Sequence, residues 1–264
     1  MPVCREDLKE MGTILNLWYT HPEHLSQQVI AEDCEQILSE EELTRSKVFP
    51  FEKNRREYLA TRLLVRRALS HYHPLPPQAW KFQTNRFGKP ATDPHCGLHF
   101  NVSNTSKLIV CLIGNNFELG VDIEPLDRAA DISTLAPEIF SPKELAQLDK
   151  LSDSEKSDRA LSLWTLKESY IKARGLGLSL PLKKFSFIFE QSNKFHLETD
   201  SSLHDTPANW QSCIFNLAEH RCALTVGSSM DPHLQIWEMR PSMNTPEHRP
   251  NILPSQPVFC RNLH

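Results

Sequence analysis

The sequence predicts an α+β fold, because two long helical patterns alternate along the chain with two sets of short apolar segments. The helical patterns cover residues 53–72 and 155–174. The apolar segments have the length of strands and are bounded by turn residues. With 264 residues, the chain is long enough for one large domain or two modest ones. A long helix and several strands in each half favour the α+β class.

The first half is expected to hold one long helix and two strands. Apolar residues recur at helical spacing between Tyr58 and Tyr72, and the proline-rich segment 74–77 ends the helix. Short strands are then expected at residues 98–103 and 108–114.

The second half begins with an expected strand at residues 117–124. Ser141 followed by Pro142 has the pattern of a helix N-cap with proline at the first helical position. Ser154 is the expected start of the long helix, and Gly175 the expected end. Residues 199–209 are polar and predict a loop. Further strands are expected at residues 185–189, 213–216, 222–227 and 234–238.

These elements divide the chain in order. We expect an N-terminal α+β half over residues 1–115 and a C-terminal α+β half, with the candidate acids, over residues 116–240. The segment that starts at Arg240 contains five prolines. Residues 241–264 are therefore expected to form an extended, proline-rich tail.

The composition excludes several classes of protein. A formal net charge of −4 argues against a general nucleic-acid binder. The first residues, MPVCREDLKEMG, do not form a secretory signal, and no apolar run reaches the ~18 residues of a membrane span. Seven scattered cysteines without a C-x-x-C pair are typical of reduced thiols, so a cytoplasmic location is expected.

The expected strand at 117–124 carries two acidic residues. Because side chains alternate along a strand, Asp122 and Glu124 lie on one face and Val121 and Ile123 on the other. The two acids could simply face water. They could also bind a hard cation such as Mg²⁺, which prefers carboxylate oxygens.

The second long helix carries a third acid. Its apolar residues cover most of its circumference, which is typical of a buried helix. Glu168 lies on an apolar stripe, four residues after Trp164 and three before Ile171. A buried carboxylate needs a partner. Lys172, four residues later, is one candidate, and a metal shared with Asp122 and Glu124 is the other; the two are compatible.

Two further segments could bind an anion. In the strand 98–104 (LHFNVSN), His99, Asn101 and Ser103 share a polar face that could donate hydrogen bonds to a phosphate, or could merely be exposed. The turn at residues 86–90 (RFGKP) offers two cations, Arg86 and Lys89.

A zinc site is a weaker alternative. His95, Cys96 and His99 fall close together, but a second cluster of ligands is missing. A loop that runs into a strand is therefore the favoured interpretation of these residues.

Taken together, these segments resemble the Sfp-type 4′-phosphopantetheinyl transferases. The matching elements occur in the family's order over residues 41–189. The pair G-[IV]-D-[IL]-E and W-x-x-K-E-[SA]-[FY]-x-K is highly specific. The matching segments are residues 88–90 (GKP), 100–103 (FNVS), 120–124 (GVDIE), 164–173 (WTLKESYIKA) and 175–178 (GLGL).

The resemblance implies a fold and a reaction. The family fold is a pseudo-dimer of two similar α+β halves, with the active site in the cleft between them. The reaction moves the 4′-phosphopantetheine arm of coenzyme A to a serine of an apo acyl or peptidyl carrier protein and releases 3′,5′-ADP. It depends on Mg²⁺. A monomer without nucleic-acid or membrane partners is expected.

The resemblance also implies residue roles. Asp122, Glu124 and Glu168 would bind Mg²⁺, and Glu168 would also take the proton from the carrier serine. Lys172 would stabilise or protonate the departing 3′,5′-ADP. Asp122 and Lys172 would therefore both count among the coenzyme-binding residues, Asp122 in addition to its role at the metal. The other coenzyme-binding residues would be Arg45 at the 3′-phosphate, Arg86 and Lys89 along the nucleotide, and Asn101, Ser103 and Asn104 beside the pyrophosphate.

One residue departs from the family pattern, and two other functions remain open. The family usually has histidine where this chain has Asn104, which can donate a hydrogen bond but cannot carry a charge. Clustered acids with a lysine also occur in metal-dependent nucleases, although these usually need a basic track. A carrier-binding module without catalysis is the other alternative, and the presence of all three acids and Lys172 argues against it.

Overall fold

The structure, a computed structural model, describes residues 14–191, 194–228, 231–240, 247–249, 253 and 257–261. The chain divides into two compact units. The first unit comprises Met1–Thr84, Pro90–Asn116 and Pro232–Ile252. The second comprises Asn85–Lys89, Phe117–Asp231 and Leu253–His264. Each unit combines helices with a β-sheet, which confirms the predicted α+β class.

The first unit is built on a five-stranded sheet with the order β12-β11-β1-β5-β4. Strand β11 runs parallel to β1, whereas β1–β5, β4–β5 and β11–β12 are antiparallel pairs. The strands are β1 (Ile14–Thr20), β4 (Leu98–Asn104), β5 (Ile109–Asn115), β11 (His233–Glu238) and β12 (Glu247–His248). A short hairpin of β2 (Gln83–Thr84) and β3 (Pro90–Ala91) precedes β4.

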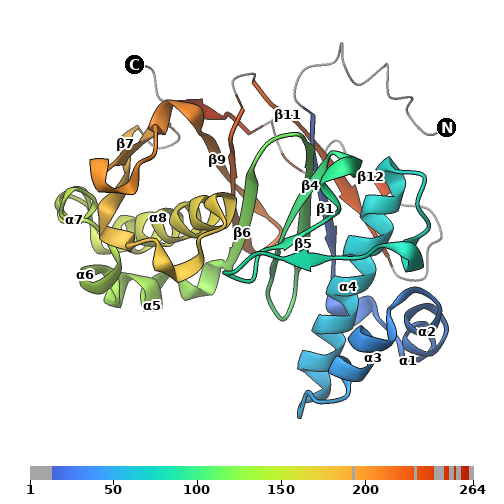
Figure 1. The fold of residues 1–264 in the computed structure, drawn as a ribbon. Helices are drawn as coiled ribbons and strands as arrows, with labels where there is room; N and C mark the ends of the chain where they lie inside the picture. Colours follow the sequence, from blue (N-terminus) through green and yellow to red (C-terminus); the bar gives the residue numbers. More distant parts are fainter. Residues whose placement is uncertain are drawn as a thin grey trace. The chain divides into compact units, whose positions relative to one another are not determined.

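The long helix of the first unit, α4 (Glu52–Tyr72), packs on strands β1, β4 and β5 (Figure 1). Its buried residues, among them Leu59, Leu63 and Leu69, recur at helical spacing, so the predicted helix and its apolar face are confirmed. Shorter helical segments lead into it: η1 (Pro22–His24), α1 (Gln27–Val29), the π-helical η2 (Ile30–Cys34), α2 (Glu35–Ile37) and α3 (Glu40–Ser46). The turns η3 (Pro77–Ala79) and η4 (Pro94–Cys96) follow it.

A buried arginine joins α3 to α4. The Glu42 side chain closes a capping box with Ser39 at the start of α3. The same carboxylate accepts a 2.9 Å hydrogen bond from Arg66 Nε on α4. Arg66 also donates to the carbonyl oxygens of Pro77 and Trp80, so its charge and its N–H groups are satisfied within the first unit.

The second unit is built on a four-stranded sheet with the order β13-β9-β10-β6, in which all pairs are antiparallel. Its long helix, α8 (Asp153–Arg174), packs on β6 and β10 (Figure 1). The strands are β6 (Leu119–Pro125), β9 (Gln211–Leu217), β10 (His220–Val226) and β13 (Cys260–Arg261), with a separate hairpin of β7 (Phe185–Gln191) and β8 (Lys194–Thr199).

Short helices cover the rest of the second unit. The segment after β6 forms η5 (Leu126–Arg128), α5 (Ala129–Thr134), α6 (Ala136–Ile139) and α7 (Pro142–Leu148). The turns η6 (Gly177–Ser179) and η7 (Leu182–Lys184) lead from α8 to β7, and η8 (Ser201–Leu203) and η9 (Pro207–Asn209) lead from β8 to β9. The segment 199–209 therefore connects two strands, as predicted.

The ends of α7 and α8 are set by their capping residues. Ser141 caps α7 with Pro142 at the first helical position, as predicted. The predicted start of α8 at Ser154 is wrong by two residues, because Ser152 forms a capping box with Glu155. Gly175 ends α8 in the left-handed conformation (φ 63°), as predicted.

A buried lysine joins α7 to α8. The Glu144 side chain closes the capping box of α7 and accepts hydrogen bonds of 3.0 and 2.8 Å from Lys167 Nζ on α8. Lys167 also donates to the Phe185 carbonyl oxygen at 2.6 Å. Both charged side chains are fully buried (0% exposed). The pair therefore stabilises the packing of α7, α8 and β7 only as long as both partners are present.

The two units differ in three places from the expected division of the chain into residues 1–115 and 116–240. Strand β11 lies in the first unit, because its backbone pairs with β1. Residues 85–89 belong to the second unit, although the strands on either side of them belong to the first. The proline-rich segment contributes β12 to one sheet and β13 to the other, and most of its remaining residues lie outside the described ones.

Two further predictions concern the whole chain. Within the described ranges, neither α4, α8 nor any shorter helix has an apolar stretch that could cross a bilayer. Six cysteines fall in the same ranges, and all six are free thiols. The reduced state of these cysteines stays a prediction, and Cys4 lies outside the described residues.

Candidate active site

The two acids of β6 are buried rather than exposed to water. Asp122 is 5% and Glu124 9% exposed, because helix α8 covers their side of the sheet. The alternative of a strand face exposed to water is therefore wrong. A buried carboxylate loses its hydration, so each of these acids requires compensating partners.

The partner of Asp122 comes from α8. Lys172 Nζ donates a 2.7 Å hydrogen bond to Asp122 Oδ1 and forms an ion pair with it. The lysine predicted as a partner for Glu168 is therefore bound to an acid of the strand. The Lys172 side chain keeps 26% of its surface exposed, so solvent can reach this pair from the Lys172 side.

Two residues that sequence reasoning did not select bind Glu124. Trp164 Nε1 on α8 donates a 2.8 Å hydrogen bond to Glu124 Oε1. Arg128 Nη1, at the end of η5, donates a 2.6 Å bond to Glu124 Oε2. The sequence placed Trp164 in an apolar stripe and in the family motif, but gave it no contact with an acid. Arg128 follows a strand and a turn, where no periodic pattern reveals a contact.

The three acids influence one another electrostatically. Burial, reinforced by the charge of Asp122, raises the pKa of Glu168 to about 7; Glu124 adds to this, and Lys172 opposes it. Burial and the charge of Asp122 also raise the pKa of Glu124. A carboxyl group that titrates near neutral pH can accept a proton and release it again under physiological conditions. Glu168 is therefore a candidate general base.

The donor set is suited to a hard divalent cation. As they stand, no three His, Cys, Asp or Glu side chains in the described part of the chain are gathered into a metal-binding group, and this includes His95, Cys96 and His99. Asp122, Glu124 and Glu168 nevertheless offer only carboxylate oxygens, and the charge of Asp122 helps to raise the pKa values of both Glu124 and Glu168. A divalent cation would relieve this repulsion, so the chemistry of the three residues fits Mg²⁺.

The two cations of the turn at residues 85–89 have different surroundings. Arg86 is exposed, and its guanidinium lies over the ring of Phe87 at 4.6 Å from the ring centre. The Lys89 side chain is only 17% exposed and points to oxygens of the second unit. Burial lowers the pKa of Lys89, and the Glu118 carboxylate opposes this effect.

The polar residues of β4 lie in the first unit. Asn101 and Ser103 are buried, at 5% exposed each, whereas Asn104 at the end of the strand is exposed. The Asn104 amide donates a hydrogen bond to the Glu57 carboxylate on α4. The residue that replaces the expected histidine therefore has an acid beside it.

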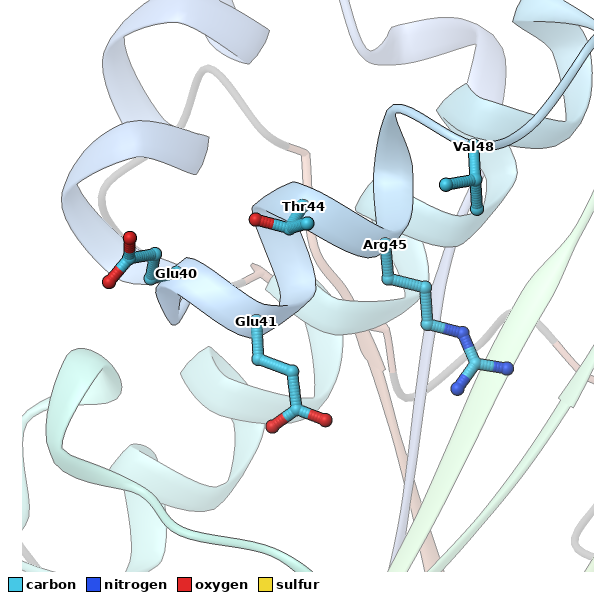
Figure 2. A pocket seen from close by; sticks show the side chains of 5 residues that line it. All are labelled: Glu40, Glu41, Thr44, Arg45 and Val48. Carbon is cyan, nitrogen blue, oxygen red and sulfur yellow. The ribbon is translucent and has the colours of Figure 1, made fainter.

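Arg45 lies on the exposed side of α3. A hollow in the surface beside this helix is lined by Glu40, Glu41, Thr44, Arg45 and Val48. Figure 2 shows Glu41 and Arg45 projecting from the same side of α3. The Arg45 guanidinium lies 6.0 Å from the ring centre of Tyr58, the residue after the Glu57 that accepts from Asn104. An exposed guanidinium in a hollow is available to an anionic ligand.

Buried acids on a strand, with a base and a lysine on the helix that covers it, are the residue types that phosphoryl-type transfer uses. Comparison with known proteins agrees with this class. The model of the 4′-phosphopantetheinyl transferase superfamily matches residues 118–225. The model of the 4′-phosphopantetheinyl transferase N-terminal region matches residues 25–115.

Individual relatives match as well. The chain is 31% identical over 167 residues to the 4′-phosphopantetheinyl transferase Sfp of Bacillus subtilis. The aligned region covers 63% of this chain and 73% of Sfp. It is 34% identical over 151 residues to the 4′-phosphopantetheinyl transferase HetI of a Nostoc species. This aligned region covers 56% of the present chain and 64% of HetI. The chain thus spans less than two thirds of the length of HetI.

The chain belongs to the 4′-phosphopantetheinyl transferase superfamily, and its similarity to Sfp and HetI confirms the Sfp-type family predicted from its motifs. The enzymes of this family are 4′-phosphopantetheinyl transferases.

Proposed function

We propose that this chain transfers the 4′-phosphopantetheine arm of coenzyme A to a serine hydroxyl of an apo acyl or peptidyl carrier protein and releases 3′,5′-ADP. The observation that carries the proposal is the group of Asp122, Glu124, Glu168 and Lys172 on β6 and α8. In this group, burial and the neighbouring acids raise the pKa of Glu168 to about 7.

Glu168 is the base in this proposal. Its carboxylate takes the proton of the carrier serine while the serine oxygen forms a bond to the phosphorus that bears the pantetheine. The bond from that phosphorus to the bridging oxygen of the pyrophosphate breaks, and the bridging oxygen leaves on 3′,5′-ADP. A carboxylate within reach of the serine hydroxyl can accept this proton, and a cation held by the same acids would favour the ionised form of Glu168 that the step needs.

Lys172 serves the leaving group. Its ammonium group lies next to Asp122 and keeps part of its surface exposed, so it can donate a hydrogen bond to a phosphate oxygen that gains negative charge. A charge-assisted hydrogen bond of this kind stabilises the departing phosphate more strongly than a neutral one.

Asp122, Glu124 and Glu168 are the residues that would hold Mg²⁺. When bound, the cation neutralises charge on the pyrophosphate, which is the main requirement of phosphoryl-type transfer. Arg128 and Trp164 hold the Glu124 carboxylate from two sides and thereby fix its orientation.

The coenzyme has further candidate ligands. In the second unit, the exposed Arg86 can reach an anionic ligand. In the first unit, Arg45 offers a guanidinium in a surface hollow, and we assign it to the 3′-phosphate. Asn101, Ser103 and Asn104 on β4 offer neutral donors for the pyrophosphate. The free thiols of the described cysteines support a reducing compartment, the cytoplasm, as the place of action, and we propose that the enzyme acts as a monomer.

The test is direct transfer. The protein is incubated with coenzyme A, Mg²⁺ and several apo carrier proteins, and each carrier is then weighed by mass spectrometry. We expect at least one carrier to gain the mass of one phosphopantetheine arm, and a carrier with alanine in place of the acceptor serine to gain none. If no carrier gains this mass, the proposed function is wrong.

A second measurement tests the nuclease alternative. Coenzyme A with Mg²⁺ should raise the melting temperature, because a ligand that binds the folded state stabilises it. DNA with Mg²⁺ should not. The reverse result would favour the nuclease alternative.

A further inference from the structure

The turn at residues 85–89 is bonded to both elements that carry the candidate active site. Lys89 Nζ donates to the Ala173 carbonyl oxygen at 2.9 Å and to the Leu119 carbonyl oxygen at 3.1 Å. It also donates to Glu118 Oε2 at 3.2 Å. Leu119 is the first residue of β6, and Ala173 lies in the last turn of α8. The Lys89 ammonium thus bridges the start of the strand and the end of the helix.

The turn is itself held rigidly. The Asn85 side-chain oxygen accepts hydrogen bonds from the backbone N–H groups of Phe87 and Lys89, at 2.9 and 3.0 Å. The Asn85 amide donates to the Gly175 carbonyl oxygen at 2.7 Å. A Cβ atom at Gly175 would lie 3.0 Å from Lys89 Cδ, so the turn packs closely against the residue that ends α8.

Next to this bridge, the helix and the strand touch without intervening side chains. A Cβ atom at Gly120 would lie 2.1 Å from the Ser169 carbonyl oxygen and 2.3 Å from the Ala173 nitrogen. Only glycine leaves room for so close an approach. The contact at Gly120 fixes the distance between β6 and α8, and the bonds of Lys89 fix their offset along the strand. Two residues further along β6, this arrangement brings Asp122 to 2.7 Å from Lys172.

The bonds of Lys89 also limit what else this residue can do. An ammonium group has three N–H donors and no acceptor. The three oxygens of Glu118, Leu119 and Ala173 match these three donors, and the side chain is largely buried. A phosphate ligand would have to displace at least one of these contacts. Arg86, three residues earlier, is exposed and has no such cost.

We propose that Lys89 is a positioning residue, which holds β6 and α8 in the offset that sets Lys172 and Glu168 against Asp122, and that its side chain does not bind the coenzyme. The inference rests on the proposed function, because it explains how the acid and the lysine of the transfer reaction are held in place. It assigns to Lys89 a role different from the nucleotide contact that the family resemblance implies.

The two roles predict different kinetics. A residue that binds the coenzyme lowers its KM, whereas a residue that positions reacting groups raises kcat. For Lys89→Met we expect kcat to fall by about 10- to 100-fold, the range typical of residues that orient catalytic groups. The KM and the calorimetric Kd for coenzyme A should stay within about twofold of the wild type. Lys89→Arg should restore part of kcat.

Two comparison variants calibrate the result. Arg86→Ala shows the effect of a lost coenzyme contact and should raise the KM for coenzyme A. Lys183→Met is the matched control, because exposed Lys183 also donates to a carbonyl oxygen, but to that of Pro137 on α6 rather than to one on β6 or α8. This variant should leave both kcat and KM unchanged. A higher KM with unchanged kcat in Lys89→Met would overturn the proposal, and so would wild-type values of both.

Two further experiments cover failure of folding or of the proposed function. If Lys89→Met does not fold, Asn85→Ala loosens the same turn while leaving Lys89 in place, and should lower kcat alone; a weaker affinity for coenzyme A would contradict the proposal. If the wild type transfers no arm to any carrier, the proposed function fails. Amide hydrogen exchange then still tests the bridge, because the last turn of α8 should exchange faster in Lys89→Met than in Lys183→Met. Equal exchange would overturn it.

Discussion

In the first unit, the buried cation of the long helix is Arg66; in the second unit, it is Lys167. Each binds a glutamate that also closes the capping box of the preceding short helix, Glu42 in α3 and Glu144 in α7. The residues of each pair are 24 and 23 positions apart in the sequence. The two units therefore use the same arrangement to join a short helix to a long one.

The residue that follows the buried cation differs between the units. In α4 it is Arg67, which forms an ion pair with Asp33. In α8 it is Glu168, whose pKa burial raises to about 7. A buried charge with a full set of protein partners stabilises packing, as Lys167 and Arg66 do. A carboxylate that is buried among other acids is destabilised in its charged form, and such groups are typical of active sites.

The largest expected effect concerns the stability of the second unit. Lys167→Met leaves the fully buried Glu144 without its cation and should lower the free energy of unfolding by about 3–5 kcal/mol. Arg66→Met should cost less, because Arg62 remains 3.6 Å from Glu42. Urea denaturation followed by a probe in each unit measures both losses. Equal losses would show that Arg62 does not compensate.

Next in size is the effect of Asp122→Ala on transfer. Asp122 is a candidate metal ligand and the partner of Lys172, so we expect a loss of about a hundredfold or more, the upper end of the range for residues that only support a ligand. Mg²⁺ affinity, measured by calorimetry in the presence of coenzyme A, should fall as well. An unchanged Mg²⁺ titration would remove Asp122 from the metal site.

A smaller effect is expected in the first unit, where Arg45→Ala should weaken the binding of coenzyme A by about 10- to 100-fold. A charge-assisted hydrogen bond to the 3′-phosphate is worth about 1.5–3 kcal/mol. Affinity for dephospho-coenzyme A should hardly change. Calorimetry with both ligands on both proteins forms a double cycle. Equal losses for the two ligands would mean that Arg45 acts through general charge or folding, and Arg86 would be the next candidate.

The last expected effect is a pH dependence of stability. Because the folded-state pKa of Glu168 is raised from 4.5 to about 7, the folded protein binds more protons than the unfolded chain between these values. The contribution of Glu168 to stability is therefore largest below pH ~4.5 and is lost as the pH rises to ~7. In a chelating buffer, the melting temperature of the wild type should fall relative to that of Glu168→Gln across this range. A constant difference would contradict the raised pKa.

Local pattern was sufficient to predict the long helices, most strands and the acids of the site. The helical spacing of apolar residues identified α4, and the alternation along β6 placed Asp122 and Glu124 on one face. Strand β1 was not predicted, because residues 14–20 (ILNLWYT) do not alternate regularly between apolar and polar side chains. The pairing of β11 with β1 joins residues far apart in the sequence, which a local pattern does not reveal.

The contacts within the site were harder to predict than its residues. The sequence identified Lys172 as a partner for Glu168, whose charge it does stabilise, but did not reveal its hydrogen bond to Asp122 on another element. It placed Lys89 in a cationic turn without showing that three protein oxygens surround it. The paired capping boxes were also missed, although Ser39 with Glu42 and Ser141 with Glu144 both have the Ser-x-x-Glu pattern of such a box.

Lys167 and Glu168 are neighbours on α8, and we give the first a structural and the second a catalytic role. The most direct test of this difference is the single-turnover rate of Glu168→Gln with saturating coenzyme A, Mg²⁺ and an apo carrier. Saturating ligands separate the chemical step from binding, and circular dichroism checks that the fold is kept. If Glu168 is the base, the rate should fall by at least about a hundredfold. Glu138→Gln, an exposed acid of the same unit, is the matched control and should react like the wild type. A near-wild-type rate for Glu168→Gln would contradict the account.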